Sequence, residues 1–284
     1  MSAVAFLSAL VLFFHNHLSP AQVAQSKPTT STKTKSLPQS TAQPVKTGVV
    51  LFSDPLNGAD RIVTNEYVHW NPKSSCAYTS KIWDMTSGTL LVKNGAGYSG
   101  IPTAEASAIC ESATKNNSAV FRLNTRQNNF SNAKVSVDYM AVQHGGANAK
   151  QNGYDGIHIW VGYQNEYALY SATIFRWDQT LVIKKKVPLA DAKCSDPSNG
   201  GCYYNLSSEK TDQTASPSNV WHHADIVYKV DKSGVVTIEM SIDGTVVANG
   251  TDSAVHGSAY AKGAVGIRGD DTEFYFKNFT VVAL

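Results

Sequence analysis

From residue 47 onward the chain has almost no helical periodicity, and this feature most limits what it can fold into. Short runs rich in Val, Ile, Tyr, Phe and Thr alternate with polar residues between clusters of Gly, Asn, Asp and Pro. Such runs predict β-strands. The clearest are residues 48–53, 89–94, 119–125, 134–142, 156–163, 167–176, 180–186, 221–230, 235–242, 245–249, 264–269 and 273–281. This spacing indicates two packed antiparallel sheets, with Asp243-Gly244 as a hairpin turn that needs positive φ.

The first 46 residues do not follow this pattern. Residues 1–21 contain an apolar run that is shorter than the ~20 residues of a membrane span, followed by small residues at the end of the segment. We expect a signal peptide or an N-terminal anchor there, and therefore a secreted or surface-tethered protein. Membrane contact is expected only through this segment, if it stays uncleaved. Residues 22–46 are rich in Ser, Thr, Pro, Gln and Lys and predict a disordered linker. Residues 47–284 then form one β-sandwich domain.

Charge and cysteine content exclude some classes of function. The net charge of +2 is too weak for the clustered basic face of a nucleic-acid-binding protein. Four cysteines suit two disulfides in an oxidising compartment, which we pair as Cys76–Cys110 and Cys194–Cys202. The second pair closes a small Gly-rich loop. No Cys-x-x-Cys spacing of a zinc site occurs, so we expect no metal bound by cysteine.

Three parts of the chain carry a family resemblance: residues 221–228 with 235–247, the closing residues 263–269 with 273–281, and the opening residues 52–56. They resemble the concanavalin A-like lectin/glucanase superfamily, and its laminin-G-like branch most. The resemblance implies an all-β, two-sheet antiparallel jelly-roll sandwich whose first and last strands are neighbours. It also implies a structural role for His222 and His223, and it allows a calcium ion between Asp54 and Asn278, to which we do not commit.

Strand alternation sorts the middle strands into an apolar face and a polar face. Aromatic rings stack on sugar rings, and the planar fork of Arg matches carboxylates, so the polar face suits a glycan. An ordinary solvated sheet face is the competing interpretation. If the strands share one sheet, this face carries Arg122, Asn124, Arg126, His158, Trp160, Tyr170, Arg176, Lys184 and Lys186.

The same residues bear on the type of reaction. The Glu-x-Asp-x-x-Glu string of the superfamily's glucanases is absent, which argues against a retaining glycosidase. A polysaccharide lyase needs a cation for the uronate carboxylate, a base and an acid. Arg126, His158, Tyr170 and Lys184 supply these types, and we predict them as catalytic. The stretch around them is faintly similar to the β-jelly-roll lyases, with Gly156-Ile157-His158 where the alginate-lyase branch has Gln-Ile-His.

These observations lead to one functional hypothesis and one alternative. We expect an extracellular, monomeric β-sandwich that binds polysaccharide without a required cofactor. Whether it is also an enzyme is left open by the sequence; if it is, a polysaccharide lyase that cleaves a uronate-containing glycan is favoured over a glycoside hydrolase. Arg122, Asn124, Trp160, Arg176 and Lys186 are then substrate-binding residues. The alternative is a non-catalytic, laminin-G-like adhesion module in which the sheet face is inert and loops contact a protein partner.

Overall fold

The computed structural model describes residues 48–102, 120–145, 152–190, 194, 200–211 and 218–284. The predicted signal segment and linker lie outside these residues, as does Cys110 of the predicted Cys76–Cys110 pair. Regular structure in the described residues is β-strand apart from one short helix, α1 (Tyr67–Trp70). No helix in these ranges is long and apolar enough to cross a membrane. The predicted all-β fold is confirmed.

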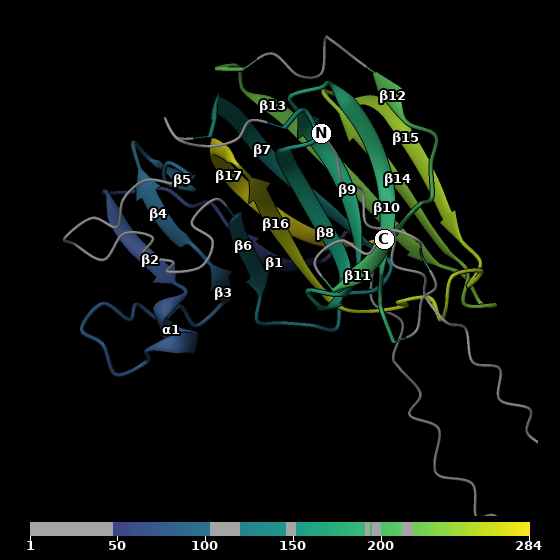
Figure 1. Cartoon of the computed structure of the whole chain (residues 1–284), viewed down its shortest axis with the longest axis horizontal. Coiled ribbons are helices and arrows are strands. Elements are labelled where there is room, and N and C mark those ends of the chain that lie inside the picture. Colours follow the sequence, from purple (N-terminus) through teal and green to yellow (C-terminus); the bar gives the residue numbers. More distant parts are fainter. Residues whose placement is uncertain (1–47, 103–119, 146–151, 191–193, 195–199, 212–217) are drawn as a thin grey trace, which may run out of the picture. The chain divides into compact units, whose positions relative to one another are not determined.

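Two antiparallel sheets form the sandwich (Figure 1). In spatial order, the first sheet contains β15 (Thr245–Asp252), β14 (Val236–Ile242), β13 (His222–Val230), β7 (Ala133–His144), β17 (Thr272–Ala283), β5 (Ala96–Tyr98), β4 (Thr89–Lys93) and β2 (Arg61–Asn65), with β1 (Val50–Asp54) also paired to β17. The second sheet contains β11 (Gly201–Asn205), β10 (Thr180–Pro188), β9 (Ala168–Arg176), β8 (Gly156–Asn165), β16 (Ala264–Asp270), β6 (Val120–Thr125) and β3 (Trp83–Ser87), with β12 (Lys210–Thr211) paired to β10.

The core lies between the two sheets and follows from the alternation of apolar residues. In β7, every second residue from Ala133 to Ala141 is buried, while the residues between them are partly exposed. The facing strand β8 contributes Ile157, Ile159 and Val161 to the same core. At ~25 cal/mol per Å² of apolar surface removed from water, this layer is the main stabilising contribution.

All twelve predicted strands are present, and five further strands were not predicted: β2, β3, β5, β11 and β12. The Asp243-Gly244 turn joins β14 to β15, and both residues have positive φ, as the sequence predicted. β1 and β17 pair antiparallel, so the first and last strands are neighbours, as the resemblance implied.

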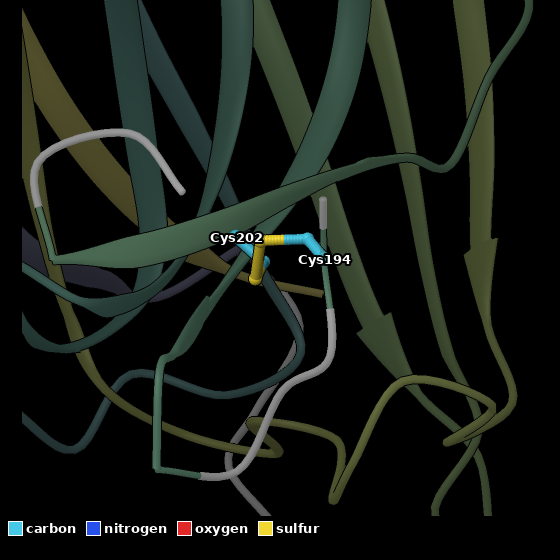
Figure 2. Close-up of a disulfide and its surroundings, with 2 residues drawn as sticks. All are labelled: Cys194 and Cys202. Atoms are coloured by element: carbon cyan, nitrogen blue, oxygen red, sulfur yellow. A yellow bond between two sulfur atoms is a disulfide. The ribbon is translucent and has the colours of Figure 1, made fainter. Parts of the chain in front are cut away.

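One disulfide lies at the edge of the second sheet (Figure 2). Cys194 and Cys202 form the predicted bond, with their Cα atoms 5.9 Å apart. Cys202 belongs to β11 and is fully buried. Because β11 pairs only with β10 in the described part of the sheet, the disulfide supplies a second attachment for this edge strand.

Candidate functional site

The outer face of the second sheet gathers basic side chains from four strands. β6 supplies Arg122, β8 supplies His158, β10 supplies Lys184 and Lys186, and β16 supplies Arg268. Arg268 is in register with Arg122 on one side and with His158 on the other. We call these five residues the cationic face. Four of the five were predicted for this face, and the structure brings them together.

Arg268 lies at the centre of the cationic face. Its Nε and one terminal nitrogen donate to Asp270 Oδ1 at 2.9 and 2.5 Å. Its other terminal nitrogen donates to the hydroxyl of Tyr203 at 3.2 Å. Tyr203 is on β11, four places away from β16 in the sheet, and neighbouring strands are ~4.8 Å apart. The two side chains meet because the sheet curves, so its outer face is concave.

His158 lies beside Arg268, between a carboxylate and a hydroxyl. Its Nε2 is 3.5 Å from Asp270 Oδ2, and its Nδ1 is 3.1 Å from Thr173 Oγ1. Burial lowers the pKa of His158 below its ordinary value; Asp270 opposes this effect, and the positive charge of Arg268 adds to it. The imidazole is therefore neutral near pH 7, the form that a general base requires.

The same charges act on Asp270 in the opposite direction. Burial alone would raise the pKa of Asp270, but the Arg268 guanidinium and the His158 imidazole outweigh it and hold that pKa well below the usual range. With Asp270 ionised, the His158 tautomer that carries its proton on Nε2 is favoured, because that N–H faces the carboxylate. The Nδ1 lone pair then points toward Thr173.

The two lysines of β10 also have altered acidity. Burial, with the positive charges of Arg268 and Arg122, lowers the pKa of Lys186 to about 8. Its ammonium lies 5.2 Å from the ring centre of Tyr203 and 5.3 Å from that of Tyr167. Burial also lowers the pKa of Lys184. Lys186 can therefore release a proton near neutral pH more readily than an exposed lysine.

The remaining predicted arginines lie at the borders of the face and are paired. Arg122 donates to Glu166 at 2.9 Å. Arg176 bonds Asp178, and its charge reaches His158 and Lys184. Arg126 lies beyond the end of β6, where its guanidinium is 3.3 Å from Asp84. The structure therefore places Arg126 away from His158, in a polar pocket at the end of β6.

Trp160 shares the outer face, but it cannot serve as the open stacking surface that we predicted. Its side chain is 1 % exposed. One neighbour is Tyr163, stacked at 5.3 Å between ring centres, and the Arg268 guanidinium lies 5.7 Å from the indole centre. Trp160 therefore packs against Tyr163 and Arg268 and leaves no ring face open to a ligand.

The prediction for Tyr170 was wrong. Its ring lies in the core between the sheets, and its hydroxyl donates to Asp252 at 2.6 Å. Strict alternation along residues 167–176 would place Tyr170 on the same face as Arg176. The β8–β9 register shifts between Ile157 and His158, so Ile174 is an extra residue and the phase changes there. Tyr170 therefore faces inward and is not a catalytic candidate.

Three residues of the site were missed: Arg268, Asp270 and Tyr203. A signal existed for Arg268, because it follows Val265 and Ile267 in strict alternation and so had to face outward. Tyr203 carries no such signal, since β11 starts at a glycine and its contact with Arg268 depends on sheet curvature.

The residues named for other roles are engaged within the protein. Asp54 accepts the Trp83 indole N–H at 2.7 Å, and Asn278 donates to Asp138 at 2.7 Å. His222 bonds Asp243, and His223 bonds Asp138, each at 2.7 Å, on the first sheet. Across the described ranges, no group of three or more His, Cys, Asp or Glu side chains could hold a metal ion.

Comparisons with solved structures concern the fold. A Bacillus subtilis protein with a galectin-like fold superimposes with a TM-score of 0.52 at 13 % identity, covering 84 % of this chain and 97 % of that one. The carbohydrate-binding module CBM66 of Bacillus subtilis gives 0.48 at 14 % identity over 72 % and 99 %. β-Agarase B of Zobellia galactanivorans gives 0.48 at 9 % identity over 81 % and 91 %.

The sequence itself has a family match. No curated protein matches it significantly. Residues 68–282 match the model of the 3-keto-alpha-glucoside-1,2-lyase-like domain. The match runs from α1 to the last strand, β17, and so includes the whole cationic face. The jelly-roll fold of the suspected superfamily is thereby supported from both sequence and structure, and the chain belongs to the family of 3-keto-α-glucoside-1,2-lyase-like domains.

Proposed function

We propose that this protein is a carbohydrate lyase that cleaves a 3-keto-α-glucoside by β-elimination across C1 and C2. The family to which the chain belongs supports the substrate class. The observation that carries the proposal is the grouping of His158, Asp270 and Arg268 on the outer face of one sheet, with a second cation, Lys186, beside them. These are the types of group that such an elimination needs.

The chemistry follows from the ketone. A carbonyl at C3 makes the C2–H bond acidic, so a base can remove that proton and leave an enolate with its charge on O3. The electron pair then forms the C1=C2 double bond as the C3 carbonyl is restored. The bond between C1 and the glycosidic oxygen breaks, and that oxygen takes a proton. The products are a 1,2-unsaturated 3-keto sugar and a free alcohol or sugar, with no oxidation, reduction or added water.

Each step has a candidate residue on the cationic face. His158 is the base: its Nδ1 lone pair takes the C2 proton once the substrate displaces the Thr173 hydroxyl, and Asp270 stabilises the imidazolium that forms. Arg268, held in place by Asp270 and Tyr203, stabilises the charge on O3. Lys186 donates the proton to the leaving oxygen, for which a pKa of about 8 is suited.

A uronate lyase, the sequence-based hypothesis, would use the same arrangement differently. There the C6 carboxylate makes the C5–H bond acidic, and Arg268 would neutralise the carboxylate. The family description favours the ketone. Turnover of polyuronates is therefore included in the test as a contradicting outcome.

The test uses p-nitrophenyl 3-keto-α-glucoside, whose cleavage releases p-nitrophenolate and an ultraviolet-absorbing enone. We expect the purified chain to produce both, and to leave the unoxidised p-nitrophenyl α-glucoside intact because its C2–H is not acidic. A polyuronate panel is run in parallel. Release from the unoxidised glucoside would indicate a hydrolase, and unsaturated product from polyuronates alone would restore the uronate hypothesis. Binding without any product would favour the non-catalytic alternative.

Replacement of the base provides the matched variant. His158→Gln should lower kcat by ~10²–10⁴-fold, the range for loss of a general base. His223→Gln, on the other sheet and 47 % exposed in its side chain, is the control and should retain the wild-type rate. Equal losses of kcat in both variants would contradict the assignment of His158 as the base.

We also propose that the domain works outside the reducing cytoplasm. The Cys194–Cys202 disulfide supports this, because such bonds persist mainly in oxidising compartments. Fractionation of the source cells, with thiol labelling of the protein under denaturing conditions, tests it. Recovery of the protein from the cytoplasm with Cys194 and Cys202 fully labelled would contradict export.

A further inference from the structure

A pocket lies beside the cationic face, at the end of β6. It has a volume of about 250 Å³ and opens to solvent. Four strands and the turns after them contribute to it, and every lining residue but the alanine is polar. The lining residues are Asp84, Asn124, Thr125, Arg126, Asn128, Tyr163, Gln164 and Ala264.

The charged groups of the pocket neutralise each other. Arg126 lies 3.3 Å from Asp84, and its Nε donates to the carbonyl of Ser80 at 2.9 Å. His69 also contacts Asp84, at 3.1 Å. Gln164 donates to two backbone carbonyls, and Thr125 donates to the carbonyl of Gln127. The pocket is thus polar but without net charge, in contrast to the cationic face.

One group in the pocket is left without the partners that burial normally demands. Asn124 is 2 % exposed, and among the described residues neither its amide oxygen nor its amide nitrogen makes a hydrogen bond. Tyr163 is a polar neighbour of this amide: burial and then the charge of Glu166 raise the pKa of the Tyr163 hydroxyl, and Asn124, placed as a hydrogen-bonding neighbour, acts weakly in the opposite direction. An unpaired buried amide costs ~1–3 kcal/mol, and a bound ligand is one partner that would remove this cost.

The backbone next to Asn124 is shaped to admit this amide. Gly266 pairs with Asn124 across β6 and β16. A Cβ at Gly266 would lie 2.4 Å from the Asn124 side-chain oxygen, so only glycine leaves the space that the amide fills. Asn124 is also two residues from Arg122, and Gly266 is two residues from Arg268. Same-face residues of a strand are ~7 Å apart, so the pocket adjoins the cationic face.

We infer that this pocket is a second sugar subsite, which receives an uncharged sugar as the leaving group, and that Asn124 is its specificity-determining residue. The inference depends on the proposed function only because it identifies this sugar as the leaving group of the elimination. The amide presents one donor and one acceptor side by side, which matches two neighbouring hydroxyls of a neutral sugar. A carboxylate or phosphate group would find no unpaired cation there, because Arg126 is held by Asp84.

The experiment compares two substrates that share the 3-keto-α-glucosyl group. One has methanol as its leaving group, and the other has glucose. We expect wild-type kcat/KM to favour the glucosyl substrate by about tenfold to thirtyfold, the equivalent of two hydrogen bonds. Asn124→Ala and the volume-matched Asn124→Leu should bring the ratio of the two kcat/KM values close to one. Asn249→Ala, on the exposed face of β15, is the control and should keep the wild-type ratio.

Two further measurements separate this inference from the proposed function and from a structural role. The thermal midpoint of Asn124→Leu should be unchanged or higher than wild type, since an unsatisfied amide is removed; a lower midpoint would indicate a structural residue. Binding of unoxidised maltose is followed by calorimetry. Asn124-dependent binding without turnover of either keto sugar would overturn the lyase and keep the subsite. Turnover with the same substrate ratio in wild type and Asn124→Leu would overturn the subsite and keep the lyase.

Discussion

Asp270 and Asp271 are consecutive residues whose acidities shift in opposite directions. Burial would raise the pKa of Asp270, but Arg268 and His158 hold it low. For Asp271 the balance is the reverse: burial, and then the negative charges of Asp155 and Asp270, raise its pKa to about 6, and His144 opposes them only in part. Two consecutive carboxylates therefore differ: Asp270 stays ionised beside Arg268, whereas ionised Asp271 is expected to destabilise the folded state at neutral pH.

The raised pKa of Asp271 predicts how the free energy of unfolding depends on pH. Its folded pKa of about 6 lies above the unfolded value of 3.8, so the folded state keeps a proton that the unfolded state releases. The free energy of unfolding therefore falls as the pH rises from about 4 to about 6. Asp271→Asn should remove this penalty and stabilise the protein by ~1 kcal/mol at pH 7, after allowing for solvent screening, with no gain at pH 3.5. Urea unfolding at both pH values measures it.

Asp243→Asn is the matched control, because both positions have positive φ. Burial would raise the pKa of Asp243, but the His223 backbone N–H and the His222 ring lower it overall. Its contribution is present above pH 3.8 and is lost as the pH falls through the lower folded value. Asp243→Asn should thus destabilise the protein at pH 7. The same sign for both variants at pH 7 would contradict this account.

The proposed base and acid set the pH dependence of the rate. His158 must be neutral, and burial holds its pKa below 6.5. Lys186 must be protonated, and its pKa is about 8. We expect kcat/KM for methyl 3-keto-α-glucoside, whose methanol leaving group needs a proton, to rise through the first pKa and to fall through the second, with its maximum between them. In Lys186→Met the alkaline limb should disappear; an unchanged limb would assign the acid to another group.

At the scale of elements, β10 contacts two different environments. Lys184 and Lys186 project outward, whereas Lys185 is 0 % exposed and lies between the sheets. Its ammonium is 2.8 Å from Asp252 and donates to the carbonyls of Gly257 and Ser258 at 2.9 and 3.1 Å. This one residue ties β10 to β15 and to the connection that leads into β16, the strand of Arg268.

Loss of Lys185 should therefore be costly. Lys185→Met leaves Asp252 buried and without its cation, which is expected to cost ~3–5 kcal/mol in chemical denaturation. Lys184→Met, whose partner Glu209 is 3.8 Å away near the surface, should cost less than ~1 kcal/mol. Adding Asp252→Asn to Lys185→Met should recover part of the loss. Equal costs for the two single lysine variants would contradict the role of the buried pair.

The disulfide is expected to act on the site through β11. Cys202 precedes Tyr203, which bonds Arg268. Replacing both Cys194 and Cys202 with Ala should lower stability by ~2 kcal/mol, the loop-entropy value for an eight-residue separation, and should also lower kcat/KM. Tyr203→Phe should share the loss of kcat/KM but keep the wild-type stability. Full activity in the cysteine variant would show that β11 holds Tyr203 without the bond.

At the scale of the whole molecule, the fold was predictable where alternation is long. β7 and β17 have 12 residues each; buried and exposed residues alternate through most of β7 and, in β17, on either side of an irregularity between Lys277 and Thr280. The missed strands have five residues or fewer, and they contain types that favour turns: β11 starts at Gly201, and β3 contains Asp84 and Ser87. Such runs are held as strands by their neighbours, through pairing that the local sequence does not encode.

The site was predictable as far as side-chain direction is local. Alternation placed Arg122, His158 and Lys186 on one face, but it failed for Tyr170, because the extra residue in β9 changes the phase. The pairing of Arg268 with Tyr203 could not be predicted at all, since it joins strands that are four places apart. Curvature is a property of the assembled sheet.

The bend of this sheet has a consequence for how the protein can change over generations. The extra residues lie in β9, opposite His158, and in β8, opposite Gly266, and each added residue increases the local twist. A flatter sheet would move β11 away from β16 and break the contact between Arg268 and Tyr203. Every polar side chain of the face would still be present. Insertions or deletions at these irregularities would therefore change or abolish the activity of this face without replacing any of its polar residues.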